Sequence, residues 1–476
     1  MSQIFISAAH KSSGKTTVTL GLCAALRTRG LAVQPFKKGP DYIDPMWLGH
    51  AAERPCHNLD FYTMGEEEIR DTVGFYSRGA DISIIEGNKG LYDGLDLDGS
   101  NSNAALAKLL GSPVVLVLDA RGMTRGIAPL ILGYQSFDPD IRIAGVILNQ
   151  LGGSRHESKL RAVIEHYTNV PVLGAVGRNP ELEILERHLG LIPSNERGDA
   201  DGQIEQIGST VGGQVDLETL TGLAGSSTTP PSPRTSPFYI KSVGKTLRIG
   251  IARDEAFGFY YPGDLEAMQQ AGAELIPIDM LHDHKLPDID GLFIGGGFPE
   301  SCMQQLQSNH SLRNTVREAI EAGLPTYAEC GGLMYLARSL KWKDRRCEMV
   351  GVIPGDVVMY PRPRGRGYVR LKATDSLPWS QAGYEAGGEI AAHEFHYSAL
   401  ENFQAPETYA FEVLRGTGID GGHDGYVYKN LLACYSHQRT TASNRWTEHF
   451  LSFVAHCKSQ RNNSETHYRR LKGRKT

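Results

Sequence analysis

A glycine–lysine–threonine sequence near the N-terminus could bind the phosphates of a nucleotide. Gly14, Lys15, Thr16 and Thr17 follow a short β-rich run and open a helical pattern. Backbone N–H groups at such a helix start can hold phosphate oxygens, a lysine neutralises the β and γ phosphates, and a threonine hydroxyl can ligate Mg²⁺. Ala9 replaces the first glycine of the GxxxxGK[ST] pattern, so an ordinary glycine turn is the alternative. The strand before the loop and the helix after it favour an ATP site.

Three polar residues at or after the ends of later strands could complete this site. Glu86 ends an apolar run. A carboxylate at the C-terminal end of a parallel strand faces the nucleotide crevice, where it can hold Mg²⁺. Asp93 is a second acid in the loop that follows, and a solvated loop acid is its alternative. Asn149 ends another apolar run and could bond an adenine edge, although an ordinary strand-end turn explains it equally well.

Two cations and two carboxylates follow one another at the end of the second predicted strand. They are Lys37, Lys38, Asp41 and Asp44. This mixture suits a crevice that holds phosphate, a metal ion and an anionic substrate. We assign Asp41 to the metal site, together with Glu86 and Thr16. The other three residues, with Asp93, are assigned to the substrate. On charge alone, a surface turn is equally consistent with the pattern.

A cysteine in the second half has the surroundings of a nucleophile. Cys330 ends a predicted strand, and Gly331 and Gly332 open a helical run after it. A tight strand-to-helix turn lifts such a side chain out of the sheet, and the helix N-terminus favours the thiolate. A buried structural cysteine is the alternative. The two glycines, which let a substrate approach, favour the nucleophile.

An oxyanion site and a base would have to accompany this cysteine. Gly296 and Gly297 follow another strand and, with Gly331 from the elbow, could point N–H groups at a developing oxyanion. A cysteine nucleophile also needs a base. The histidines in suitable segments are His393, His396 and His437. Their spacing alone does not choose among them.

Both halves of the chain alternate short apolar runs with helical patterns. The runs lack polar alternation, as do parallel strands that helices bury on both faces. They are Ile4–Ser7, Ile82–Glu86, Val114–Asp119, Ile143–Asn149, Val172–Val176, Leu247–Ala252, Gly291–Ile294 and Pro325–Ala328. We therefore predict an α/β protein with two domains and mainly parallel sheets.

A segment rich in Pro, Ser, Thr and Gly, at residues 222–237, divides the chain near its middle. Such a composition buries little apolar surface and predicts an extended linker. We predict a first domain over residues 1–221, a linker over 222–245, a second domain over 246–457 and a basic tail over 458–476. The polar composition of the tail predicts disorder.

The overall composition limits the classes of partner. The formal net charge of the 476 residues is -5, which disfavours nucleic acid. Seven cysteines without a CxxC pair indicate neither a disulfide framework nor a zinc site. The N-terminus lacks the features of a secretory signal, and no run of about 18 apolar residues could span a membrane. We expect a cytoplasmic protein without a membrane partner.

Taken together, these segments resemble the cobyrinic acid a,c-diamide synthase family over nearly the whole chain. The resemblance rests on Gln34–Asp44, Asn58–Asp60, Glu86–Gly87, Gly90–Gly94, Glu186–Leu191, Asp254–Phe257, Phe259–Pro262, Ala328–Leu336 and His393–Ser398. It implies an N-terminal ATP-dependent amide-forming domain of the P-loop, dethiobiotin-synthetase-like type. It also implies a C-terminal class I glutamine amidotransferase-like domain with His437 as the base. The usual His-x-Glu pattern ends in Arg439 here, so the third catalytic member stays open.

The resemblance further implies a stepwise reaction that uses ATP, Mg²⁺ and glutamine. Cys330 and His437 would release ammonia from glutamine. A substrate carboxylate would take the γ-phosphoryl group of ATP, and ammonia would convert the acyl phosphate to an amide. The substrates of the family are tetrapyrroles amidated at the a and c acetates. A homodimer is an assembly that we also consider.

Departures from the family pattern leave the substrate ring open. Asn88 and Lys89 replace small apolar residues, and Arg362, Arg364 and Arg366 form either a solvated basic loop or a grip for substrate carboxylates. These features look more like the branch that amidates siroheme or sirohydrochlorin in sulfur metabolism. We therefore give cobyrinate-type and siroheme-type substrates equal weight. A P-loop ATPase switch with an inactive amidotransferase domain is a third hypothesis.

An aromatic cluster could present flat surfaces to a macrocycle. It consists of Phe257, Phe259, Tyr260 and Tyr261. Aromatic residues at such spacing more often belong to a core, and the sequence leaves both interpretations open.

Overall fold

The computed structural model divides the chain into two compact units, Met1–Pro237 and Phe238–Thr476. The division falls inside the predicted linker. The structure describes residues 2–182, 186–187, 190–196, 198–226, 236–238, 240, 244, 246–379, 387–404 and 408–472, with side chains of the last segment described up to 462. Residues 188–189 of the segment Glu186–Leu191 and residues 227–235 of the predicted linker lie outside this description.

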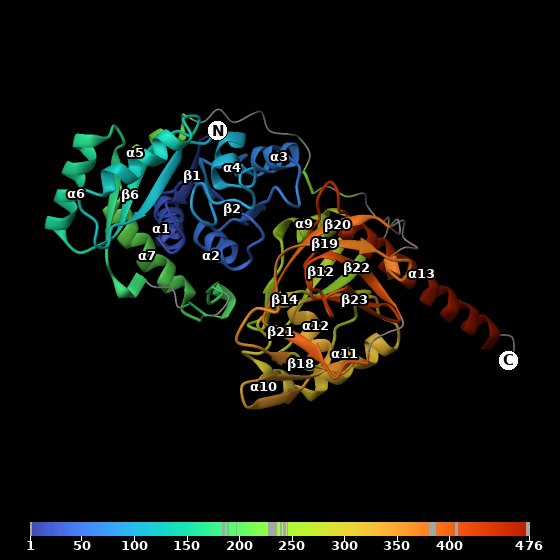
Figure 1. Cartoon of the computed structure of the whole chain (residues 1–476). Helices are drawn as coiled ribbons and strands as arrows, with labels where there is room; N and C mark the ends of the chain where they lie inside the picture. The colour runs from blue at the N-terminus through green and yellow to red at the C-terminus, as the bar shows by residue number, and fades with distance from the viewer. Residues whose placement is uncertain are drawn as a thin grey trace. The chain divides into compact units, whose positions relative to one another are not determined.

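The first unit is built on a seven-stranded sheet in the order β3-β2-β4-β1-β5-β6-β7 (Figure 1). All neighbouring strands are parallel, as their continuous apolar runs predict. The strands are β1 (Gln3–Ala8), β2 (Val33–Lys38), β3 (His57–Leu59), β4 (Ile82–Glu86), β5 (Val114–Asp119), β6 (Ile143–Leu151) and β7 (Val172–Gly177). A separate ribbon pairs β8 (Glu186–Arg187) with β9 (Gly190–Leu191).

Helices cover this sheet. Their bounds are α1 (Lys15–Thr28), α2 (Ile43–Ala52), α3 (Glu66–Tyr76), α4 (Asn103–Leu110), α5 (Ile127–Phe137), α6 (Ser154–Tyr167), α7 (Ala200–Gln214) and α8 (Leu217–Ala224). Apolar side chains of α3, α4, α5 and α6 share one buried cluster with the sheet. Helix α1 packs on β1, β2 and β4 and on α2 and α7. Because α8 ends at Ala224, the described helix extends three residues into the predicted linker.

Small residues set the position of α1, the helix that follows the phosphate loop. A side-chain carbon added at Gly208 of α7 would lie 2.7 Å from the Cβ of Ala24, and one at Gly212 would lie 2.8 Å from the Cβ of Ala25. Figure 1 shows the two helices side by side. Their close approach therefore depends on glycines, and bulkier residues would push α1 out of place.

The second unit is built on a nine-stranded sheet in the order β12-β10-β13-β15-β24-β23-β22-β19-β20. Neighbouring strands are parallel from β12 to β24 and antiparallel from β24 to β20. The prediction of a mainly parallel sheet was therefore wrong for half of this sheet. Strand β19 alternates buried and exposed residues along much of its length, as antiparallel strands with one solvent-exposed face do.

The remaining elements complete the second unit. Its strands are β10 (Leu247–Ala252), β11 (Phe257–Phe259), β12 (Ala273–Ile278), β13 (Gly291–Ile294), β14 (Gly296–Gly297), β15 (Thr326–Glu329), β16 (Ala337–Trp342), β17 (Arg345–Glu348), β18 (Ile353–Met359), β19 (Gly365–Ala373), β20 (Glu389–His396), β21 (Ser398–Glu401), β22 (Tyr409–Arg415), β23 (His423–Tyr428) and β24 (Leu431–Cys434). Its helices are α9 (Pro262–Gln270), α10 (Met303–Ser308), α11 (His310–Glu321), α12 (Gly331–Leu336) and α13 (Trp446–Lys472).

The last helix differs from its prediction. Helix α13 is continuous from Trp446 to Lys472, so the segment expected to be a disordered tail is helical over most of its length. Its first turns supply Trp446, Phe450 and Val454 to the buried interior of the second unit. That anchored start allows the helix to continue into the basic segment. Within the described residues, no helix has the length and apolar character needed to cross a membrane.

Candidate active site

The phosphate loop takes a conformation that its glycine permits. Gly14 caps α1 with φ of 78°, a left-handed value that favours glycine. A side-chain carbon there would lie 2.0 Å from the Asn149 Nδ2 atom. That amide nitrogen donates a hydrogen bond to the Ser13 carbonyl at 2.9 Å. Asn149 thus ties the end of β6 to the loop, and its contact with adenine stays a prediction.

The lysine and threonine of the loop meet the end of β4. Thr16 Oγ1 donates to Glu86 Oε1 at 2.8 Å and to Asp44 Oδ2 at 3.3 Å. Lys15 Nζ donates to the Asn88 carbonyl at 2.6 Å and lies 3.8 Å from Glu86. Burial lowers the pKa of Lys15, against the attraction of Glu86. These predicted residues therefore come together as the nucleotide interpretation requires.

Lys37 lies at the centre of three carboxylates. Its Nζ donates to Glu86 Oε1 at 2.9 Å, bonds to Asp44, and lies 3.8 Å from Asp41 Oδ2. Burial opposes the charge of this lysine, but Asp44 and Glu86 raise its pKa well above the usual value. Burial and the neighbouring Asp44 raise the pKa of Asp41 to about 7. The site thus holds several charges of both signs at close range.

The residues present fit a Mg²⁺ ion bound together with phosphates. Glu86 Oε2 is buried and has no hydrogen-bond partner, and the Thr16 hydroxyl lies against the other oxygen of the same carboxylate. In the described part of the chain, no group of three or more His, Cys, Asp and Glu is placed to hold a metal. Mg²⁺ binds through one or two carboxylates, water and substrate phosphates, and the Glu86 carboxylate beside the phosphate loop offers such a ligand. Asp41 as a further ligand stays a prediction.

Three predicted residues have other surroundings. Lys38 Nζ donates to Asn101 Oδ1 at 3.2 Å, and burial lowers the pKa of this lysine to about 8. Asp93 Oδ2 accepts from the Gly90 N–H at 2.9 Å and so closes its own exposed loop. Thr17 is the third residue of α1 and is half-buried. Their roles in phosphate or substrate binding stay predictions.

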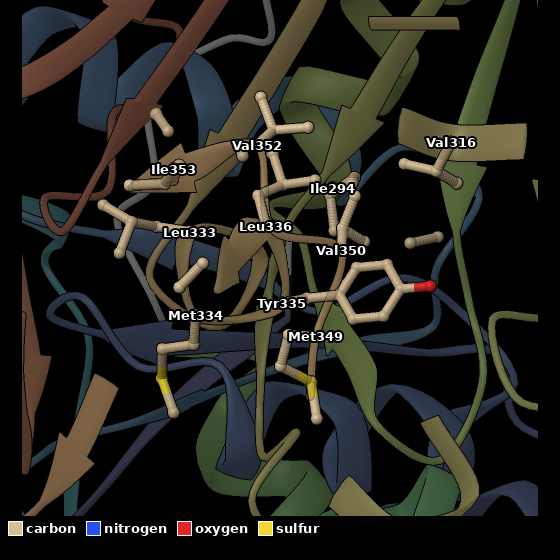
Figure 2. Close-up of a cluster of buried hydrophobic side chains, with 14 of the residues drawn as sticks. Ile294, Val316, Leu333, Met334, Tyr335, Leu336, Met349, Val350, Val352 and Ile353 are labelled. Carbon is tan, nitrogen blue, oxygen red and sulfur yellow. The ribbon is translucent and has the colours of Figure 1, made fainter. Parts of the chain in front are cut away.

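In the second unit, Cys330 forms the predicted elbow between β15 and α12. Its backbone angles, φ 47° and ψ -99°, are rare for a residue with a side chain. A side-chain carbon at Gly332 would lie 2.2 Å from the Ile294 carbonyl oxygen, so only glycine fits there. Figure 2 shows Leu333, Tyr335 and Leu336 of α12 in a buried apolar cluster. This packing holds the strained turn in place.

The pairing of β15 with β24 brings His437 to the cysteine. Glu329 lies opposite Cys434 in the parallel register, and the Cys330 N–H donates to the Cys434 carbonyl at 2.8 Å. His437 Nδ1 lies 3.4 Å from Glu329 Oε2. Burial alone would lower the pKa of His437, but hydrogen bonds to Cys330 and Glu329 raise it to about 10. Of the three candidate bases, His437 therefore has the required partner.

The other two histidines have different surroundings. The His393 ring stacks on His437 with centroids 4.9 Å apart, and the two backbones bond to each other. Burial, His437 and Arg439 lower the pKa of His393 well below its usual value, so this ring stays neutral. The His396 ring stacks on Tyr435, and its Nδ1 bonds to the Ser398 carbonyl at 2.8 Å. His393 therefore packs against the ring of the base, and His396 belongs to the buried interior.

The predicted oxyanion glycines gather at the same place. Gly296 and Gly297 form β14, which pairs with β11. A side-chain carbon at Gly296 would lie 2.7 Å from His437 Cε1, and one at Gly331 would lie 3.0 Å from the Gly297 nitrogen. The missing side chains thus let the His437 ring and the two glycine segments approach each other closely beside the nucleophile. Oxyanion binding by their N–H groups stays a prediction.

The structure places two groups of residues that the sequence offered for substrate binding. Phe257, Phe259 and Tyr261 are buried, and Phe257 makes an edge contact with the ring of Tyr335 in the apolar core. The idea that they face a macrocycle was therefore wrong, because their faces are already covered. Arg362, Arg364 and Arg366 are exposed, and the latter two lie over the rings of Tyr360 and Phe395. Their surroundings are those of a surface segment.

The structure also reveals an acid that the sequence interpretation missed. Glu329, the residue before the nucleophile, faces the base across the strand pair. A search for His-x-Glu could not find it, because the carboxylate comes from another strand. What brings Glu329 to His437 is the parallel pairing of β15 with β24, whose ends lie side by side.

Comparison with known proteins agrees with the sites of both units. Residues 4–192 match the CobQ/CobB/MinD/ParA nucleotide binding domain, and residues 248–445 match the CobB/CobQ-like glutamine amidotransferase domain. A protein of Magnetococcus marinus called cobyrinate a,c-diamide synthase is 45% identical over 95% of this chain and 97% of its own. One of Methanosarcina acetivorans with the same name is 42% identical over 91% of this chain and 92% of its own. Among solved structures, PurLQS from Thermotoga maritima aligns at 15% identity and a TM-score of 0.35, covering 46% of this chain and 99% of that one, which is too distant to support an argument.

Proposed function

This chain belongs to the cobyrinate a,c-diamide synthase family, and on that premise we propose that it amidates the a and c acetate carboxylates of a cobyrinate-type tetrapyrrole. The nitrogen comes from glutamine and the energy from ATP. The observation that carries the proposal is the presence in one chain of two sites. One is a buried phosphate-loop site with Lys15, Thr16 and Glu86, and the other is a Cys330–His437 pair.

The second unit would release ammonia. The Cys330 thiol gives its proton to the His437 imidazole, and the sulfur attacks the side-chain carbonyl carbon of glutamine. Backbone N–H groups of the glycine segment stabilise the oxyanion that forms. The carbon–nitrogen bond then breaks as His437 returns the proton to the departing ammonia, which leaves a thioester on Cys330. Water hydrolyses the thioester to glutamate and restores the thiol.

The first unit would use this ammonia. A carboxylate oxygen of the substrate attacks the γ-phosphorus of ATP, the bond to ADP breaks, and an acyl phosphate forms. Ammonia adds to the acyl carbon, loses a proton, and displaces phosphate to give the amide. Lys15 and the buried Lys37 would offset the negative charge that builds up on the phosphoryl group and on the substrate carboxylate. Bound Mg²⁺, held by Glu86 and the Thr16 hydroxyl, would supply further positive charge at the phosphates.

The identity of the ring rests on the relatives. Both proteins named above are called cobyrinate a,c-diamide synthases and match the chain over nine-tenths of its length. The departures at Asn88 and Lys89, together with Arg362, Arg364 and Arg366, keep a siroheme-type ring as the alternative substrate. The paired Cys330 and His437 also argue against an ATPase switch with an inactive amidotransferase domain. Such a domain would not need a cysteine that has a strained backbone and a hydrogen bond to a histidine.

The test separates the two nitrogen sources. Cys330→Ser should abolish product formation with glutamine and retain it with ammonium salts, because ammonia enters the reaction after the thioester step. Cys434→Ser is the matched control, since Cys434 is also buried, on the adjacent strand, and this variant should keep both activities. If Cys330→Ser loses ammonia-dependent synthesis as well, or keeps the glutamine-dependent reaction, the proposal is wrong.

A further inference from the structure

The histidine of the amidotransferase site lacks the glutamate that usually follows it by two residues. That position is Arg439, which lies over the rings of Tyr261 and Phe238. We propose that Glu329, the residue directly before the nucleophile, replaces the missing acid and is the positioning residue that orients His437. The inference rests on the proposed glutaminase function.

The geometry places this carboxylate at the correct nitrogen. Glu329 Oε2 lies 3.4 Å from His437 Nδ1, and each side chain is 3% exposed. A carboxylate on one ring nitrogen fixes the tautomer and leaves the other nitrogen to exchange a proton with the nucleophile. His437 also forms a hydrogen bond with Cys330. The acid, the histidine and the cysteine therefore meet where β15 and β24 end.

A network of hydrogen bonds holds the glutamate in position. Glu329 Oε1 accepts from the Tyr327 hydroxyl at 2.7 Å and from the Gln438 N–H at 2.9 Å. The Gln438 amide donates to the Tyr327 hydroxyl at 3.1 Å and accepts from Asn444 Nδ2 at 3.3 Å. One carboxylate oxygen is therefore satisfied by fixed donors, and the other is left to the imidazole.

The sheet explains why this residue can take the role. Tyr327 and Glu329 are two residues apart on β15 and so share one face of the strand. The parallel register puts Glu329 opposite Cys434, and the chain that leaves β24 reaches His437 and Gln438 three and four residues later. The same strand end thus presents both the acid and the nucleophile. The His-x-Glu position is then free to hold an arginine.

Charge supports the same assignment. An ionised carboxylate at this depth needs a cation or several donors, and the imidazolium supplies the cation. The charged and titratable groups around His437 are Cys330, Glu329, His393 and Arg439. Cys330 and Glu329 raise the pKa of His437, and burial of the ring opposes them. Loss of the glutamate charge would therefore leave the imidazolium with less to offset its burial.

The experiment compares Glu329→Gln with the wild-type chain. Glutamate release from glutamine should fall by about 10²–10⁴-fold, by comparison with removal of the acid from a catalytic triad. The alkaline limit of this activity, where His437 loses its proton, should move to lower pH. Ammonia-dependent amidation should stay at the wild-type rate. Glu329→Asp, which keeps the charge, should restore the alkaline limit even where the rate stays reduced.

Matched variants separate positioning from stability. Glu394→Gln changes an equally buried carboxylate beside His396, at 3.6 Å, and should leave the pH profile unchanged. Tyr327→Phe removes one anchor of Glu329 and should move the alkaline limit in the same direction by a smaller amount, which keeps the test decisive if Glu329→Gln does not fold. A Gln variant with wild-type rate and an unmoved alkaline limit would overturn the inference. Absence of glutamate release by the wild-type chain would instead contradict the proposed function.

Discussion

Glycine at position 330 should make the second unit more stable than alanine does. Cys330 has φ 47° and ψ -99°, angles that crowd the side-chain carbon of any residue except glycine. Both substitutions delete the thiol and abolish glutamine-dependent synthesis. Only glycine also removes the side-chain carbon, so the comparison isolates the backbone strain of the elbow.

The expected difference follows from two opposing terms. A residue held in a sparsely populated backbone region costs about 1–3 kcal/mol. Glycine removes this cost, but its greater freedom in the unfolded chain offsets about 0.4–1 kcal/mol relative to alanine. Cys330→Gly should therefore be more stable than Cys330→Ala by about 1 kcal/mol, the balance of these two terms.

Urea unfolding followed by tryptophan fluorescence measures this difference. Three of the four tryptophans, Trp342, Trp379 and Trp446, belong to the second unit, so the signal reports mainly on its unfolding. The control is Cys434, which is fully buried in β24 at an ordinary backbone position. There the order should reverse, with alanine more stable by about 0.5–1 kcal/mol. If Cys330→Ala were as stable as Cys330→Gly, or more stable, the inference that the elbow is strained would be refuted.

Three further predictions concern groups in both units. Lys15→Ala and Glu86→Ala should each abolish amidation with glutamine and with ammonia, because both act on the nucleotide; a near wild-type rate with ammonia in either variant would remove that residue from the site. Burial raises the pKa of Asp264 to about 7, so the folded state keeps a proton that the unfolded chain releases from about pH 4 upward. The free energy of unfolding should therefore fall as pH rises from 4 to 7, by at most about 1.4 kcal/mol per pH unit, and Asp264→Asn should flatten this slope; an unchanged slope in urea titrations would contradict it. Tyr260→Phe removes the hydroxyl that accepts from the Gly295 N–H at 3.0 Å. Glutamate release should therefore fall, and the free energy of unfolding should drop by about 1–3 kcal/mol. Unchanged kinetics would show that this bond does not shape the glycine segment.

The local motifs could be predicted because each depends on neighbouring residues. The phosphate loop needs a strand, a glycine and a helix in succession, and the elbow at Cys330 needs the same kind of order. The parallel strands of the first unit follow from apolar runs such as Val114–Asp119, which the structure confirms as β5. In these cases the chemistry and the fold lie within one short stretch of chain.

The features that were missed depend on the register between distant segments. Glu329 meets His437 only because β15 and β24 are parallel neighbours. Phe257 and Tyr261 became core residues because other elements cover them, which the aromatic pattern cannot reveal. The antiparallel half of the second sheet and the helical extension of α13 likewise depend on partners far along the chain.

The most direct test of the account is amide formation on a defined ring. Purified chain is incubated with ATP, Mg²⁺ and glutamine, and cobyrinate, hydrogenobyrinate, sirohydrochlorin and siroheme are offered in separate reactions. Mass spectrometry counts the amides, because each replacement of OH by NH₂ lowers the mass by one unit. The account predicts two amides on cobyrinate or its metal-free form, and none when ATP is omitted. If no ring gains an amide while glutamate is still released from glutamine, the proposed tetrapyrrole substrate is wrong.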